Sequence, residues 1–281
     1  MPVISLEQTD AVPGALEDNT ADILARSGRA LGAGADIVVF PELANSGYLL
    51  DPAMVERSAQ PLDGALVGDL TALTAKHGGL VATGFCERED DRFYNSVVVV
   101  GRDGPILHYR KIHLFDRERE VFAAGDLLPV VETEFGVLGV CVCYDLRFVE
   151  VLRVLSLRGA DIVLAPAAWV GGFDPAVPAD GLTKQAEAAV VQANLDQVAV
   201  VAVSQVSADA RHGVRTLGGS LAVDAFGNVV CGPLSRSRPE SATVTIDIEA
   251  GRGARVRGER IRPRTDRRRD VYALMHGEET L

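Results

Sequence analysis

The sequence predicts an α/β fold in which two mixed β-sheets pack between helices, a four-layer α-β-β-α sandwich. The first observation is a repeat, because GADIVVFP at 34–41 recurs as GADIVLAP at 159–166. The second is that the apolar runs at 97–100 and 198–203 are nearly continuous, which is typical of strands covered on both faces. Two similar halves that share one core satisfy both observations. A single doubly wound sheet is the alternative arrangement.

The order of elements is also the same in both halves. A helical pattern at 21–31 precedes the first GADIV strand, and another at 150–157 precedes the second. The hairpin predicted at 96–107 is repeated at 220–231, and in both a β-branched run meets a turn containing Asp and Gly before a second run follows. Because this repeat has nearly the same offset as the first, we predict two pseudo-two-fold halves.

Composition excludes several classes of protein. With 281 residues, 47% of them hydrophobic and 24% charged, the chain has the make-up of a globular domain. The net charge of -11 argues against nucleic acid and anionic membranes as partners. No apolar run approaches the roughly 18 residues of a spanning helix, and the amino terminus lacks a basic region, so we expect a cytoplasmic protein. The four cysteines lack disulfide or zinc spacing, which fits free thiols in a reducing compartment.

The carboxy-terminal segment 250–281 differs from the rest of this acidic chain. Nine arginines lie between Arg252 and Arg269. We predict an extended tail held by ion pairs on its own acidic body or on a partner subunit. An arm that binds nucleic acid is the alternative, but no aromatic or recognition-helix pattern accompanies the charge.

Three chemically active side chains stand at the ends of predicted strands. Cys143 follows the apolar run 137–142, and Glu42 and Lys111 each follow a predicted strand in the first half. A thiol, a carboxylate and an amine delivered by strand ends are the parts of a nucleophilic active site.

Each of these groups has a definable task. A free thiol has a pKa near ~8.5 and needs a base, and Glu42 at the mouth of a buried strand is desolvated enough to act as one. Lys111 is one of only three lysines against 25 arginines, and its ammonium would stabilise a thiolate and an oxyanion. A Cys-His hydrolase that uses His108 or His113 as the base is the alternative.

Four motifs of the chain carry a family resemblance, namely FPEL at 40–43, YRKIHLF at 109–115, CYDLRF at 143–148 and RRDVY at 268–272. In these motifs the chain resembles the nitrilase, or carbon-nitrogen hydrolase, superfamily. They extend over nearly the whole chain, so the resemblance implies one domain, 1–281, with that superfamily's α-β-β-α fold. It also implies a second glutamate between the lysine and the cysteine, for which Glu118 has better spacing than Glu120.

The resemblance also implies a mechanism. Glu42 would take the thiol proton, and Cys143 would attack an amide-like carbon. Lys111 and the backbone N–H of Tyr144 would hold the oxyanion, while Glu118 would position substrate or Lys111 or assist the base. Ammonia would leave, and water would hydrolyse the thioester. The superfamily implies no metal and no organic cofactor, and it implies a homodimer or higher homo-oligomer.

The substrate class is narrowed by the motif at 143–147. The form CYDLR is similar to that of amidases acting on small aliphatic or ω-amides, whereas true nitrilases more often carry Trp after the cysteine. We therefore predict a small-molecule amide substrate. An N-carbamoyl amide hydrolase, a nitrilase and a non-catalytic interaction protein are the alternatives. Tyr48, Tyr144, Trp169 and Phe173 are predicted to contact substrate.

Overall fold

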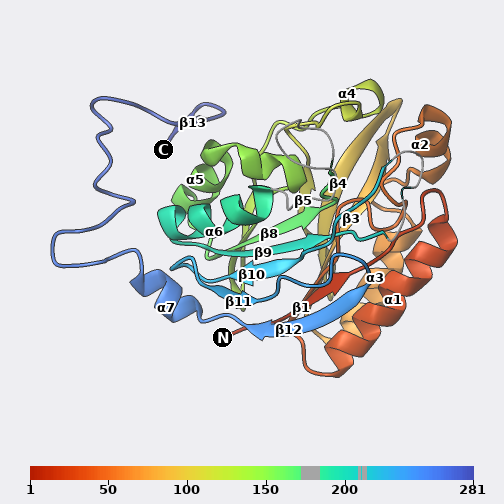
Figure 1. Cartoon of the computed structure of the whole chain (residues 1–281), viewed down its shortest axis with the longest axis horizontal. Coiled ribbons are helices and arrows are strands. Elements are labelled where there is room, and N and C mark those ends of the chain that lie inside the picture. Colours follow the sequence, from red (N-terminus) through yellow and green to blue (C-terminus); the bar gives the residue numbers. More distant parts are fainter. Residues whose placement is uncertain (172–183, 208–209, 211–213) are drawn as a thin grey trace.

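The structure, a computed structural model, describes residues 1–171, 184–207, 210 and 214–281. It contains two six-stranded sheets that pack face to face, with helices on their outer faces (Figure 1). The first sheet has the order β12 (Glu240–Thr245), β1 (Val3–Gln8), β2 (Ile37–Val39), β3 (Leu80–Glu89), β4 (Arg92–Gly101) and β5 (Gly104–Arg110). The second has the order β11 (Val229–Cys231), β10 (Leu221–Val223), β9 (Ala199–Ser204), β8 (Ile162–Ala167), β7 (Gly136–Val140) and β6 (Val130–Thr133).

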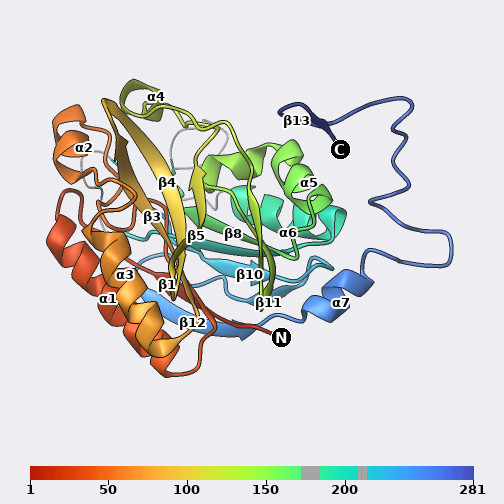
Figure 2. The ribbon, with the colours of Figure 1, turned by 180° about the vertical axis from the view of Figure 1, so that it is seen from behind.

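The helices form the two outer layers, and shorter helices lie at the ends of the sheets (Figure 2). They are α1 (Leu16–Gly32), α2 (Pro52–Ser58), α3 (Ala65–His77), α4 (Glu118–Val121), α5 (Val149–Leu157), α6 (Lys184–Asp196) and α7 (Ile248–Gly253). A 3₁₀ turn covers Cys143–Arg147, and a short hairpin of β13 (Met275–His276) and β14 (Glu279–Thr280) lies near the carboxyl terminus. None of the helices in the described part of the chain has both the length and the apolar character that crossing a membrane requires.

The two halves have the same sheet topology, which confirms the prediction from the sequence repeats. In the first sheet β1 pairs parallel with β2 and β2 with β3, after which β4 and β5 are antiparallel. In the second sheet β7, β8, β9, β10 and β11 repeat this pattern in the same order. Strands β12 and β6 add antiparallel to β1 and β7, at equivalent positions.

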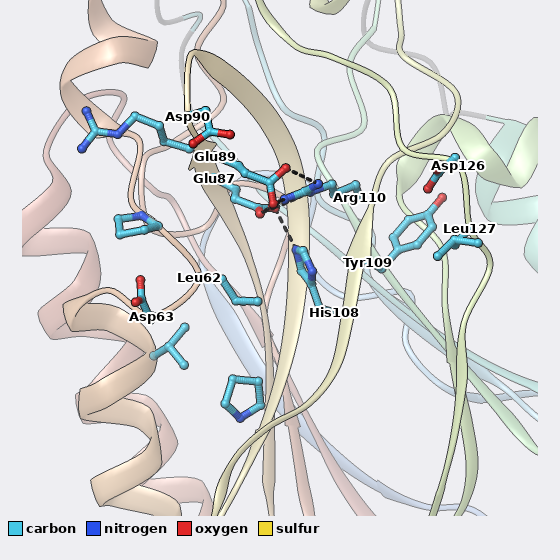
Figure 3. Close-up of a pocket in the computed structure, with 14 residues that line it drawn as sticks. Leu62, Asp63, Glu87, Glu89, Asp90, His108, Tyr109, Arg110, Asp126 and Leu127 are labelled. Carbon is cyan, nitrogen blue, oxygen red and sulfur yellow. Dashed lines mark hydrogen bonds and ion pairs between the residues drawn. The ribbon is translucent and has the colours of Figure 1, made fainter.

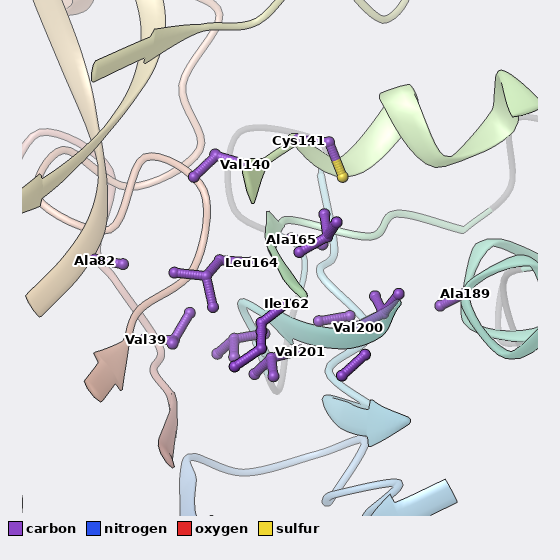
Figure 4. Packing of buried hydrophobic residues seen from close by; sticks show 14 of the residues in the cluster. Val39, Ala82, Val140, Cys141, Ile162, Leu164, Ala165, Ala189, Val200 and Val201 are labelled. Atoms are coloured by element: carbon purple, nitrogen blue, oxygen red, sulfur yellow. The ribbon is translucent and has the colours of Figure 1, made fainter. Parts of the chain in front are cut away.

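The alternation of side chains along the central strands explains the four layers. Val38 of β2 lies in the cluster beneath α1 and α3, whereas Ile37 and Val39 belong to the core between the sheets. Successive residues of a strand point to opposite faces of the sheet, so a fully apolar strand contributes side chains to two hydrophobic cores. Figure 4 shows Val39 and Ala82 of the first sheet facing side chains of the second, namely Ile162, Leu164 and Val201.

Helix α1 begins earlier than the apolar pattern at 21–31 predicts. Its first turn, from Leu16, contains Glu17 and Asp18, which are polar and give no apolar periodicity. Negative side chains at this position favour the partial positive charge of a helix amino terminus. The first turn of the helix is therefore favoured by its acidic residues, which are not part of the apolar pattern.

The Arg-rich tail contacts the body of its own chain. Arg252 reaches Asp161 at 2.9 Å, and Arg264 donates to the backbone oxygens of Asp196 and Gln197 at 3.1 and 2.9 Å. After α7 the chain runs outward and then returns to the side of α5 (Figure 1). There the backbone N–H of Leu128 donates to the ring of His276 at 2.9 Å. Contact of this tail with a partner subunit stays a prediction.

Candidate active site

The sheet topology brings the predicted acid, amine and thiol to one end of the sandwich. Glu42 lies three residues beyond β2, Lys111 directly follows β5, and Cys143 opens the 3₁₀ turn that follows β7. The backbone N–H of Glu42 donates to the carbonyl of Ala167 at the end of β8, at 3.3 Å. This contact joins the loop after β2 in the first half to the second half.

Lys111 lies between two buried carboxylates. Its Nζ is 2.7 Å from Oε1 of Glu42 and 2.9 Å from the carboxylate of Glu118, and all three side chains are fully buried. Glu118 also accepts hydrogen bonds from the hydroxyl of Tyr48 at 2.8 Å and the backbone N–H of Phe115 at 2.9 Å. An ammonium has three N–H donors, so these two carboxylates leave one of them for another acceptor.

The two oxygens of Glu42 have different surroundings. Oε1 accepts from Lys111 and from the side-chain amide of Asn95, each at 2.7 Å. Oε2 is buried and has no hydrogen-bond partner in the described part of the chain. Because buried polar atoms are nearly always paired, this exception requires an explanation. A carboxylate whose other oxygen is already neutralised, and whose Oε2 is free, is suited to accept a proton.

Cys143 is held in an unusual backbone conformation. Its φ of 48° is in the left-handed region, which costs free energy for a residue with a side chain. The backbone N–H of Ala168 donates to its sulfur. Burial raises the pKa of the Cys143 thiol well above its usual range, Glu42 adds to this effect, and Lys111 opposes it. The resting thiol is therefore neutral and needs a base when it reacts.

The charge state of the amine is set by its neighbours. Burial alone would lower the pKa of Lys111, but Glu118 and Glu42 outweigh it and hold that pKa above its ordinary value. Burial raises the pKa of Glu118, and Lys111 opposes the shift. Lys111 thus remains an ammonium throughout the neutral pH range, as an oxyanion partner must.

Several residues that support the site were not singled out from the sequence. Asp145 is fully buried and accepts from the hydroxyl of Tyr109 at 2.6 Å and the backbone N–H of Val142 at 2.8 Å, which fixes the turn containing the cysteine. Gln205 donates to the backbone oxygen of Glu42 at 2.6 Å. Asp145 lies inside the motif CYDLRF at 143–148, but the motif does not show which groups its carboxylate binds.

The two histidines considered as alternative bases have other partners. His113 lies 2.8 Å from Asp145 and stacks on Phe148 with ring centroids 3.6 Å apart. His108 lies 2.8 Å from Glu87. In the described structure neither is paired with Cys143, so the geometry favours Glu42 as the base.

A narrow pocket opens in front of the thiol. Its volume is about 10 Å³, close to the space of a single water molecule. Tyr48, Tyr144 and Trp169, three of the four residues predicted to contact substrate, line it together with Cys143. The fourth, Phe173, lies outside the described residues. The other lining residues are Phe115, Ala168, Val170 and Gln185, which were not predicted to contact substrate.

A family model described as carbon-nitrogen hydrolase matches residues 3–256. The chain belongs to the carbon-nitrogen hydrolase family. An (R)-stereoselective amidase from Pseudomonas is 34% identical over 217 residues, which cover 76% of each chain. An omega-amidase from Xenopus tropicalis is 30% identical over 252 residues, which cover 86% of each. An amidase structure from Nesterenkonia has a TM-score of 0.79 at 21% identity, covering 96% of this chain and 94% of that one, and shows the same fold.

A larger cavity of this carbon-nitrogen hydrolase lies elsewhere. It has a volume of about 710 Å³ and is lined by segments around β3, β5 and α3 (Figure 3). Buried Glu87 accepts hydrogen bonds there from Ser96 and Arg110 and contacts His108. Cys143 is not among the residues that line this cavity.

Replacing Glu87 by Gln should lower the stability of this carbon-nitrogen hydrolase in a pH-dependent way. Burial would raise the pKa of Glu87, but hydrogen bonds from His108, Arg110 and Ser96 outweigh it and lower that pKa to about 2. A depressed pKa stabilises the fold above pH ~4.5, and this contribution is lost as the pH falls towards 2. We expect a loss of about 2 kcal/mol at pH 7, below the ~3–5 kcal/mol of a fully buried pair because solvent screens the partners.

Urea unfolding of the native protein and Glu87→Gln between pH 7 and pH 3 measures this effect. The difference between them should shrink steadily below pH 4.5. A difference that stays constant over this range would show that Glu87 contributes by packing and not by its charge.

Proposed function

We propose that the protein hydrolyses the carbon-nitrogen bond of a small aliphatic or ω-amide and releases a carboxylate and ammonia. The observation that carries this proposal is the unpartnered Oε2 of Glu42 beside a buried, neutral thiol. A base, a nucleophile and an ammonium lie together in one closed site, which is the minimum that acyl transfer from an amide requires.

In the first half of the reaction Oε2 of Glu42 takes the thiol proton as the sulfur of Cys143 bonds to the amide carbon. The carbonyl oxygen becomes an oxyanion, which accepts from the free N–H of Lys111 and from the backbone N–H of Tyr144. The N–H groups that open a helical turn have no partner within it, which leaves that of Tyr144 available. Protonated Glu42 then gives its proton to the amide nitrogen, the carbon-nitrogen bond breaks, and ammonia leaves.

In the second half a water molecule attacks the thioester. Glu42 takes a proton from this water, the oxyanion forms again beside Lys111, and the sulfur of Cys143 leaves and recovers the proton. Glu118 positions Lys111, because it binds the same ammonium as Glu42 and accepts a hydrogen bond from Tyr48. We propose no metal and no organic cofactor, since these residues supply every proton and charge.

A panel of small amides, ω-amides, carbamoyl amino acids and nitriles tests the proposed reaction through ammonia release. We expect ammonia from the first two groups. Equal amounts of ammonia and carbon dioxide from carbamoyl compounds would favour an N-carbamoyl hydrolase, and turnover of nitriles alone would favour a nitrilase. Release from none of the four groups would contradict catalysis and leave an interaction protein.

We further propose that the protein forms a homodimer through α5 and α6. These helices expose large apolar side chains at Val149, Val191 and Leu195, which are 60%, 55% and 50% exposed. A cavity of about 510 Å³ lies beside them, between the helices and the tail, where Tyr272 is also exposed. Apolar patches of this kind on a soluble protein mark association surfaces.

Replacing Leu195 by Asp should convert a dimer into a monomer of 29.8 kDa, because the charge would be buried without a partner. Light scattering after size exclusion measures the mass. Val12→Asp is the matched control, since Val12 is 45% exposed but lies between β1 and α1, on the other side of the molecule from α5 and α6 (Figure 1). A native protein that is already monomeric would refute the proposal, and so would loss of the dimer in both variants.

A further inference from the structure

Two residues of the pocket in front of Cys143 carry buried polar atoms that nothing in the described structure satisfies. They are the indole N–H of Trp169 and the side-chain carbonyl Oε1 of Gln185. Trp169 is 2% exposed and Gln185 is 4% exposed, so bulk water cannot supply their hydrogen bonds freely. Neither atom has a part in the proposed proton transfers. A substrate group that takes the place of water in this pocket therefore meets residues with one unpaired donor and one unpaired acceptor, and it binds best when it satisfies both.

Both residues are held by rigid parts of the fold. The backbone of Trp169 is held by two hydrogen bonds. Its N–H donates to the hydroxyl oxygen of Ser204 at 3.1 Å, and its carbonyl accepts from the backbone N–H of Leu217 at 2.8 Å. Gln185 lies in the first turn of α6. Ala168, whose N–H contacts the reacting sulfur, directly precedes Trp169. The backbone of Trp169 is therefore held in place, and its side chain lines the same pocket as Cys143.

The chemistry of these atoms defines the group that fits them. The indole N–H only donates and Oε1 of Gln185 only accepts, so the matching group must do both. A carboxylate has no donor for Gln185, and it would lie near the two acidic side chains of the site, Glu42 and Glu118. An ammonium has no acceptor for Trp169. A hydroxyl or a second carboxamide does both and carries no charge.

We propose that Trp169 and Gln185 recognise the acyl part of the substrate, and that the preferred substrate is a small amide whose acyl chain carries a hydroxyl or a second carboxamide. This inference rests on the proposed amidase function and narrows its substrate class. It differs from a preference for plain alkyl amides or for ω-amides that bear a free carboxylate.

The test compares kcat/KM for four amides of matched length, which are butyramide, 3-hydroxybutyramide, succinamide and succinamic acid. The native enzyme should favour the hydroxyl and dicarboxamide compounds over butyramide by at least about tenfold, the effect of one net hydrogen bond, because butyramide leaves the buried polar atoms unpaired. Trp169→Phe keeps an aromatic ring but removes the donor, and Gln185→Met keeps the length but removes the acceptor. Each should lower that ratio about tenfold, mainly through KM.

Val170→Ala is the matched control, because it trims an apolar wall of the same pocket and should leave the ratio unchanged. A native enzyme that hydrolyses all four amides equally would overturn this inference alone. A preference for succinamic acid, or an equal loss on all substrates in Trp169→Phe and Gln185→Met, would also overturn it. Failure of the native enzyme to hydrolyse any amide would instead refute the proposed function.

Discussion

Replacing Cys143 by Ala should abolish the release of ammonia from every amide, with a fall in kcat of at least about 10⁴-fold. The sulfur forms the bond to the acyl carbon, and alanine offers no atom that can replace it. Water alone would have to attack an amide, which is a far poorer electrophile than a thioester. A coupled ammonia assay measures the loss, and unfolding in urea shows that the variant remains folded.

Cys141→Ala is the matched control for this experiment. Cys141 is buried like Cys143 and lies two residues earlier, but its side chain packs in the apolar core on the α5 side of the second sheet (Figure 4). We expect this control to retain activity. More than one per cent of native activity in Cys143→Ala would contradict the thioester mechanism.

Replacing Glu42 by Gln should lower kcat by about 10²- to 10⁴-fold with little change in KM. Glutamine has the same shape and keeps an oxygen for Lys111 and Asn95, so the site should remain assembled. The amide nitrogen that replaces Oε2 cannot accept a proton. The thiol, whose pKa is raised by burial, would then lack the group that deprotonates it.

The same substitution at Glu87 serves as the control for Glu42→Gln. Both glutamates are buried and bonded to cations, but Glu87 lies in the separate cavity of Figure 3. Glu87→Gln should lose stability and keep its kcat at pH 7. If Glu42→Gln stays within tenfold of the native kcat, another group must be the base.

The sequence was sufficient to predict the layers and the strand ends but not the hydrogen bonds between them. The repeat of GADIV at 34–38 and 159–163 indicated matching halves because equivalent strands bury equivalent side chains. Asn95, however, contacts Glu42 only because β4 and the loop after β2 meet through the pairing of β3. Such contacts depend on register between distant segments, which local patterns do not contain.

The conformation around the Cys143 thiol could not be predicted from the local sequence either. Cys143 could be identified from its place after an apolar run, but its left-handed backbone depends on Asp145, which binds the N–H of Val142 from the far side of the turn. The unequal pairing of the two Glu42 oxygens likewise depends on where the folded chain places Lys111 and Asn95, which both bind Oε1. A motif states which groups are present, and only the assembled fold determines which of their atoms are free.

The two repeated halves of the fold supply different catalytic side chains. In the repeat, Glu42 corresponds to Ala167, and these two residues meet across the boundary through a backbone hydrogen bond. One half supplies the acid and the amine, and the other supplies the thiol. The chemistry therefore belongs to neither half alone, because the reacting groups come together only where the two halves pack against each other.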